Sequence, residues 1–321
     1  MSKSTNILEL HYWLDNDLHS MSAVVQNKCE AELLSIINEI ATIFESEVVI
    51  ETEPLAEGGI RRWFTLVSKN EKNNLTISLA LISTFAITVL VTPIATAISK
   101  SVEIMIENVL EDDTEKEGKE LDNEEKKLRI EKLKLEILEK KKQIESSYRI
   151  QKRKSNFYEE LEKEKKVNKV SFIIEDENKK PKLEEFQVIR NDFKNYILVS
   201  DKLEPITIEN AVIEIITPVL KKGNYKWKGF YNDDVVSFNM KSNEFKTLVQ
   251  TGKIEFRNGS SIDCVLEIEN ELDNEGNKKV TAYNILRVNN YFDNDKPIET
   301  PEGKLHRQKI EADKDQYKMD I

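Results

Sequence analysis

The sequence predicts an α+β protein that crosses a membrane once. Two observations predict this class. Leu75 to Ile98 is a run of 24 residues without a charge, and the chain on both sides alternates between helical and strand-like patterns. As a helix this run spans about 36 Å, whereas about 20 apolar residues cross a bilayer core of roughly 30 Å. We expect a small N-terminal β-α-β unit, one transmembrane helix, a long helical coiled-coil segment and a C-terminal, mainly antiparallel β domain.

The composition excludes several classes of enzyme. The 321 residues include 48 basic, 59 acidic and 3 histidine side chains, with a formal net charge of −11, and only 9 glycines. Neither a GxGxxG nor a Walker A loop is present, so glycine-cradled nucleotide chemistry is not expected. Cys29 and Cys264 have no zinc-site spacing and form no disulfide framework, which is typical of a reducing compartment. We therefore expect no enzymatic activity, no cofactor and no metal.

An N-terminal domain is expected over residues 1–72. Its first nine residues lack the basic and apolar regions of a signal peptide. Apolar periodicity predicts a strand, a helix and two further strands, at Ile7–Leu14, Val24–Phe44, Glu47–Thr52 and Ile60–Val67.

Residues 73–110 are expected to hold the transmembrane segment and an interfacial helix over Ile94–Leu110. Hydroxylated or small residues recur at every fourth position, and Pro93 is expected to kink the helix. Such a row either packs copies of the helix together, with hydroxyls bonded to carbonyls four residues earlier, or lines a narrow polar pore. A buried core helix is the soluble alternative. The candidate pore or packing residues are Thr76, Thr84, Thr88, Thr92, Thr96 and Pro93.

A charged linker and a long helix are expected over residues 111–167. Leu121 to Lys166 contains neither Gly nor Pro, and Ile130, Ile137 and Ile144 are seven residues apart. Isoleucines at heptad spacing need a partner, so a coiled coil or helical hairpin is favoured over a solvated helix held by charge pairs. The basic cluster Arg149–Lys154 is either a solvated face or a contact for anionic lipid or nucleic acid.

Residues 168–297 predict a compact, largely antiparallel β domain that binds a ligand or partner, and residues 298–321 a disordered tail. Tyr225–Tyr231 and Val235–Met240 are expected to pair as a hairpin, and a short helix ends before Gly252. The other strands are expected at Val170–Ile174, Tyr196–Val199, Ile206–Ile216, Ile262–Glu269 and Val280–Asn289.

The segment Lys221–Tyr231 interleaves lysines with aromatic residues. Nucleic-acid-binding proteins stack bases on aromatic side chains and contact phosphates with lysines. Because side chains alternate faces along a strand, a buried aromatic face with solvated lysines explains the same pattern. The candidate ligand-binding residues are Lys221, Lys222, Tyr225, Trp227 and Lys228.

This order of parts resembles the channel subunits of the bacterial Hailong anti-phage defence system, with Leu75–Ile98, Leu121–Lys166 and Lys221–Tyr231 in matching roles. The resemblance implies a homo-oligomer, a tetramer favoured, whose coil and C-terminal domain gate the membrane segment. It also implies a nucleotidyltransferase partner that makes a nucleic-acid oligomer as ligand. Basic residues before the apolar run place the N-terminal domain in the cytoplasm, and a hairpin through Pro93 would keep both ends there.

The function predicted from these features is a gated ion channel of anti-phage defence in the bacterial inner membrane. A nucleotide, an oligonucleotide or a partner at the cytoplasmic C-terminal domain would control it. The alternative is a membrane-anchored scaffold that recruits partners without a pore. An enzyme in the C-terminal domain is the least favoured hypothesis, because no nucleophile is paired with a base.

Overall fold

The computed structural model describes residues 6–14, 20–52, 60–68, 75–96, 123–293 and 296–319. The chain divides into two compact units. Unit 1 comprises Met1–Ser200 with Asn274–Asn277, and unit 2 comprises Asp201–Asp273 with Lys278–Ile321. Each unit combines helices with one sheet, so the α+β part of the predicted fold class holds.

Unit 1 contains a five-stranded sheet in the order β2-β3-β1-β4-β5, with every neighbouring pair antiparallel. The strands are β1 (Asn6–Leu14), β2 (Val48–Thr52), β3 (Ile60–Ser68), β4 (Val167–Glu175) and β5 (Phe186–Ile189). From the sequence, β4 was expected in the C-terminal β domain. The structure pairs it with β1, so the sheet begun by the N-terminal strands is completed about a hundred residues later.

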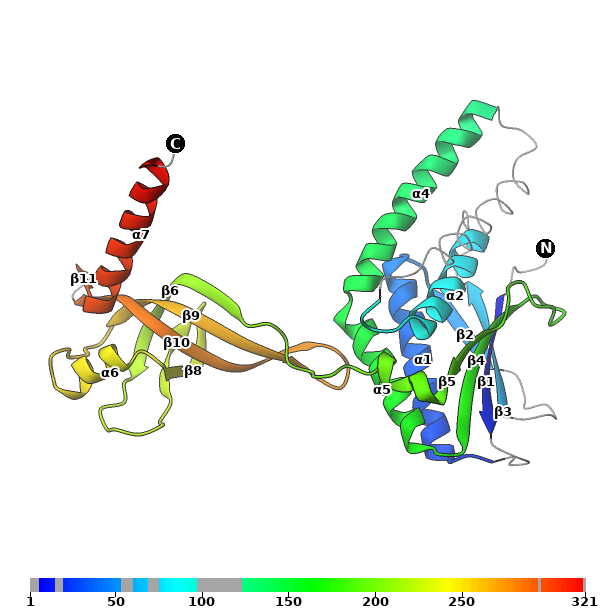
Figure 1. Ribbon diagram of the computed structural model, residues 1–321, viewed down its shortest axis with the longest axis horizontal. Coiled ribbons are helices and arrows are strands. Elements are labelled where there is room, and N and C mark those ends of the chain that lie inside the picture. Colours follow the sequence, from blue (N-terminus) through cyan, green and yellow to red (C-terminus); the bar gives the residue numbers. More distant parts are fainter. Residues whose placement is uncertain are drawn as a thin grey trace. The chain divides into compact units, whose positions relative to one another are not determined.

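Helices cover one face of this sheet (Figure 1). Helix α1 (Ala23–Ile43) begins after Ser22, whose hydroxyl accepts from the amide of Val25, an N-cap that satisfies an otherwise unpaired donor. Its apolar stripe packs with alternate residues of β1, among them Leu8 and Leu10, in one core. The predicted helix and the three predicted N-terminal strands are confirmed within one or two residues at each end.

The predicted transmembrane helix is wrong. Helix α2 covers only Leu75–Val91, and all of residues 81–90 are buried in the core of unit 1. A helix that is apolar all round is either a membrane span or a buried core helix, and here protein surrounds it. Across the described residues, no helix combines the length and apolar character that a membrane crossing requires. The ion-channel and inner-membrane predictions depended on this helix and are contradicted with it.

Pro93 ends the apolar helix instead of kinking it. The amide of Thr92 still bonds to the carbonyl of Thr88, but proline has no amide hydrogen with which to continue the ladder. Ile94 then bonds through its amide to the carbonyl of Asn195. The interfacial helix expected over Ile94–Leu110 lies mostly outside the described residues.

The predicted long coiled coil is also wrong. Two helices, α4 (Asn123–Ser146) and α5 (Tyr148–Lys163), meet at Ser147, whose hydroxyl caps α5 by accepting from the amide of Ile150. Two of the three isoleucines at heptad spacing do find a partner, because Ile137 and Ile144 are buried in the core of unit 1, and the side chain of Ile130 lies outside the described residues. Leu128 and Leu135 remain 67% and 64% exposed, so no second helix covers their stripe in the described part of unit 1.

Two further segments differ from the prediction. Arg190–Tyr196 is a 3-10 helix, η1, and no strand follows over residues 197–199. Residues expected to form a disordered tail include β11 (Lys296–Glu299) and helix α7 (Pro301–Met319). The hydroxyl of Thr300 accepts from the amide of Gly303 and so caps the first turn of α7.

Unit 2 is built on strands β6 (Ile206–Thr217), β7 (Trp227–Tyr231), β8 (Asp234–Met240), β9 (Ser261–Leu272) and β10 (Lys278–Asp293). Strand β10 pairs with both β8 and β9, and β9 pairs with β6, so the order β6-β7-β8-β10-β9 closes on itself. Among these strands, only the β8–β10 pair is parallel. Helix α6 (Asn243–Gln250) connects β8 with β9, after its Ser242 cap.

The β7–β8 hairpin turns through Asn232 and Asp233, both with positive φ, as the two-residue turns of right-twisted hairpins require. Inside the closed sheet, Trp227 packs against Phe238 and Phe245. Gly229 has no room for a side chain, since an added Cβ would lie 2.6 Å from the carbonyl oxygen of Glu214. The predicted hairpin, helix and glycine C-cap at Gly252 are confirmed.

Candidate nucleic-acid interface

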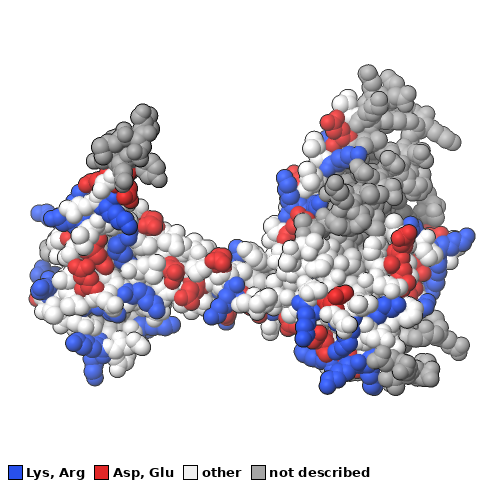
Figure 2. All heavy atoms as spheres, viewed as in Figure 1, with Lys and Arg blue, Asp and Glu red and all other residues white. Residues whose placement is uncertain are grey.

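One side of unit 2 carries a concentration of positive charge. Residues 217–257 include eight basic and four acidic side chains, in a protein that is acidic overall. Figure 2 shows Lys and Arg side chains gathered on the part of unit 2 where Figure 1 places α6 and the connection from β6 to β7. We call the following six residues the lysine cluster: Lys221, Lys222, Lys226, Lys228, Lys241 and Lys246.

The lysine cluster is electrostatically uncompensated. Within the described part of the chain, none of its members forms an ion pair with a carboxylate. Five of the six are exposed, and Lys246 is half-buried on α6. Two of its members, Lys241 and Lys246, line one cavity. Unpaired ammonium groups on the same side of a domain raise the local concentration of anions and favour phosphate binding.

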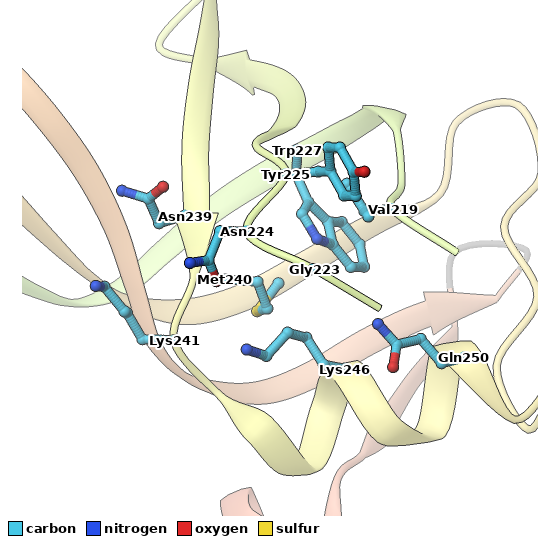
Figure 3. A pocket seen from close by; sticks show the side chains of 10 residues that line it. All are labelled: Val219, Gly223, Asn224, Tyr225, Trp227, Asn239, Met240, Lys241, Lys246 and Gln250. Carbon is cyan, nitrogen blue, oxygen red and sulfur yellow. The ribbon is translucent and has the colours of Figure 1, made fainter. Parts of the chain in front are cut away.

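A cavity of about 280 Å³ lies beside this cluster (Figure 3). Trp227 and Met240, which are buried, form its apolar floor, and Lys246 and Gln250 project into it from α6. The Nε2 atom of Gln250 also donates to the carbonyl of Lys221 at 3.4 Å, which ties the β6–β7 connection to the helix. The cavity therefore combines an apolar floor, amide groups and ammonium groups, the mixture that small-molecule pockets use for orientation.

Tyr225 forms the exposed wall of this cavity. Its side chain is 58% exposed, whereas Trp227 two residues later is 1% exposed. The tyrosine ring lies over Gly223, whose φ of +144° favours glycine and where an added Cβ would lie 2.7 Å from the ring. An aromatic ring held in this way presents one face for stacking with a planar ligand.

The outer surface of the same strands is partly apolar. On β7, Phe230 is 39% exposed and lies between Glu214 on β6 and Val235 on β8. Lys228 lies two residues away along β7, opposite Ser237. The hairpin end beyond Phe230 carries Asp233 and Asp234, so the positive potential belongs to the end of the hairpin nearest the β6–β7 connection.

The structure separates the residues proposed from the sequence. Tyr225 and Trp227 line one cavity, but Trp227 does so as a core residue, so the core interpretation of this side chain applies. Lys221, Lys222 and Lys228 are exposed nearby without lining the cavity. Sequence reasoning missed Asn224, Lys241, Lys246 and Gln250. Their only signal was the basic excess of residues 217–257, because the fold brings α6 beside the connection from β6 to β7.

A second cavity in unit 2, of about 560 Å³, is a weaker candidate for an anion. Its cations are already paired: Arg287 with Glu209 at 3.3 Å, and Arg307 with Glu299 at 2.8 Å. These pairs neutralise the charge that would attract a phosphate.

The candidate pore residues lie in unit 1. Thr84, Thr88 and Thr92 are buried, Thr96 is exposed, and the side chain of Thr76 is outside the described residues. The hydroxyl of Thr88 donates to the carbonyl of Thr84 at 2.7 Å, the local bonding that is the alternative to pore lining.

Unit 1 also buries a cluster of ionisable groups on the face of its sheet opposite α1. Glu9 accepts from the indole of Trp63 at 3.1 Å, and its other oxygen lies 3.6 Å from Arg61. Burial raises the pKa of Glu9 and of Glu175, and for Glu175 the Glu9 carboxylate raises it further. Burial, followed by the charge of Arg61, lowers the pKa of His11 to about 4. Among the described residues, no group of three potential metal ligands occurs here or elsewhere.

No protein-family profile, curated protein or solved structure matches the chain. The function is therefore inferred from the geometry of the two units.

Proposed function

We propose that unit 2 binds a short single-stranded oligonucleotide through the lysine cluster and the cavity behind Tyr225. The observation that carries this proposal is the absence of any carboxylate partner for six neighbouring lysines in the described part of the chain. The protein has 11 more acidic than basic residues, so carboxylates that could pair with these lysines are plentiful. Because the lysines are nevertheless unpaired, a negatively charged ligand is favoured as their partner.

The topology supports this ligand class by analogy. A closed five-stranded sheet with one helix between its third and fourth strands is the arrangement of OB folds, which bind oligonucleotides across strands two and three and the loop between strands one and two. In unit 2 these are β7, β8 and the connection that carries Tyr225. A fold alone does not determine function, so the surface chemistry has to agree. Here it does, because the unpaired lysines lie on or beside those elements.

The contacts follow from the side chains. A base stacks on the exposed ring of Tyr225, and its edge meets the amides of Asn224 and Gln250 at the cavity. Lys246 and Lys241 contact the adjoining phosphates. The strand then runs along Lys228 and the exposed ring of Phe230, and it stops before Asp233, where like charges repel it. The cavity volume suits one nucleotide unit.

Fluorescence anisotropy of the full chain with a labelled ten-nucleotide single-stranded DNA and RNA tests the proposal. Affinity should fall as salt rises, with a slope of about −0.7 in log K for each phosphate contact. The double variant Lys241→Ala, Lys246→Ala should bind more weakly and flatten that slope by about 1.4, the sum for two lost contacts.

The matched control is the double variant Lys304→Ala, Lys309→Ala, which removes two exposed lysines from α7, outside the cluster. It should leave the affinity and the slope unchanged. Absence of binding by the unaltered chain at low salt contradicts the proposal. An equal loss in the two double variants contradicts it as well, because binding would then follow net charge alone.

A further inference from the structure

Unit 1 also contains a cavity, which the proposed function does not use. It measures about 310 Å³ and lies between the end of α2, the end of α4 and the first turns of α5. Its apolar walls are Ile94, Ile144 and Ile150, and its polar lining includes Thr92, Gln151 and Lys154. This lining combines apolar side chains with one buried cation, so it suits a different class of ligand from the lysine-rich surface of unit 2.

Lys154 is the unusual member of this lining. Lys154 is only 6% exposed, although lysine is almost never fully buried without a partner. Within the described part of the chain, its Nζ atom makes one hydrogen bond, to the carbonyl oxygen of Thr92 at 3.0 Å. No ion pair joins Lys154 to a carboxylate in the described part of the chain, and Glu145, which also lines the cavity, has an interaction of its own. Burial lowers the pKa of Lys154 to about 8, so the group is still mostly protonated at neutral pH.

An ammonium group has three donors, and Thr92 accepts only one of them. Leaving charged donors buried without acceptors is costly, so the arrangement is incomplete as it stands. An anion that enters the cavity would supply the missing acceptors. A phosphate dianion would need several cations, whereas a carboxylate needs one cation and accepts two donors.

We propose that this cavity binds a small organic carboxylate, whose oxygens pair with Lys154 and whose apolar part lies against Ile94, Ile144 and Ile150. Gln151 also lines the cavity, and its Nε2 atom donates to the carbonyl of Glu145 at 2.7 Å, which leaves its amide oxygen as a further polar group. The site is in unit 1 and is independent of the oligonucleotide surface. A bound carboxylate would contact residues of α4 and α5 and of the segment that follows α2, and it would thereby stabilise the packing of these three elements.

Isothermal titration calorimetry of the full chain with hexanoate tests this site. Hexanoate should bind at pH 7, and hexan-1-ol, which has the same apolar chain without a charge, should bind at least roughly tenfold more weakly. A bound carboxylate keeps Lys154 protonated. Binding at pH 8 should therefore take up about half a proton, measured from the difference between buffers of unlike ionisation enthalpy, and binding at pH 6 should take up almost none.

Lys154→Met removes the charge and keeps the length of the side chain, and it should weaken hexanoate binding by roughly tenfold or more. Lys309→Met is the matched control and should bind as the unaltered chain does. Equal affinity for hexanoate and hexan-1-ol, or no proton uptake at pH 8, overturns the proposal. The last measurement needs no variant, so the proposal stays testable if Lys154→Met does not fold.

Discussion

The Nζ atom of Lys154 lies 3.0 Å from the carbonyl oxygen of Thr92, where the most apolar segment of the chain ceases to be helical. Two tyrosine hydroxyls bond to the preceding carbonyls, Tyr158 to Leu90 at 2.6 Å and Tyr196 to Val91 at 3.1 Å. A helix end leaves its last carbonyls without intrahelical partners, and burying them unpaired is costly. Side chains from α5 and η1 thus allow an uncharged helix to end inside a protein core.

Tyr158→Phe should destabilise unit 1 because it leaves the buried carbonyl of Leu90 without a donor. We expect a loss of about 1–3 kcal/mol in the free energy of unfolding, measured by urea denaturation. The matched control is Tyr12→Phe, since Tyr12 is equally buried but its hydroxyl has no partner among the described residues. That change should be neutral or stabilising. Equal destabilisation by the two variants would show that the hydroxyls contribute through packing alone.

Glu175→Gln should make unit 1 more stable at neutral pH. Burial and the neighbouring Glu9 carboxylate raise the pKa of Glu175 in the folded state above its ordinary value of 4.5. The folded protein therefore holds this proton more strongly than the unfolded chain. The contribution of protonated Glu175 to the stability of the fold is complete below pH 4.5 and is lost as pH rises through the raised pKa of the folded state.

Glutamine does not ionise, so the Glu175→Gln variant does not lose this stability as pH rises. Its gain in the free energy of unfolding over the unaltered chain should be absent near pH 4 and should grow toward about pH 7. Urea denaturation across that range measures it. Glu177→Gln, which removes one carboxylate from an exposed position after β4, is the control for a change of net charge alone. A gain that does not change with pH would contradict the assignment to ionisation.

His11→Gln should reduce the sensitivity of unit 1 to mild acid. Burial and the charge of Arg61 lower the pKa of His11 to about 4, whereas the unfolded side chain titrates near its ordinary value of 6.5. The contribution of His11 to stability is present above pH 6.5 and is lost as pH falls through the folded pKa of about 4. Glutamine does not titrate, so the difference between the variant and the unaltered chain should change between these two pKa values and stay constant above them. His306→Gln, on α7 of unit 2, should not reproduce this change.

Local patterns were sufficient to predict most individual elements. The alternation at Ile262–Glu269 predicted β9, and Ser242 with Gly252 predicted both ends of α6, because these signals depend on neighbouring residues only. The pairing of β4 with β1 could not be predicted this way. It depends on contacts between residues more than 150 positions apart, such as Leu10 and Phe172.

The wrong prediction of a transmembrane helix also has its cause in contacts between residues that are far apart in the sequence. An uncharged helix is compatible with lipid or with a core, and only the surrounding residues decide between them. The decisive groups are Tyr158, Tyr196 and Lys154, which lie more than 60 positions after α2 in the sequence. For the candidate site, the lysine and aromatic residues of 221–231 were visible in the sequence. Lys241 and Lys246 join them only through the fold of unit 2.

Tyr225→Ala should weaken oligonucleotide binding more than Tyr225→Phe. Stacking of one base on an aromatic ring contributes about 1–3 kcal/mol, and phenylalanine keeps the ring while losing only the hydroxyl. Alanine should therefore raise the Kd by roughly tenfold or more in fluorescence anisotropy, without changing its salt dependence, because no phosphate contact is removed. Tyr225 is 58% exposed, so neither change should affect the thermal stability of unit 2. Equal affinities for the two variants would remove Tyr225 from the binding surface, and an altered salt slope would show that it acts by positioning the lysines.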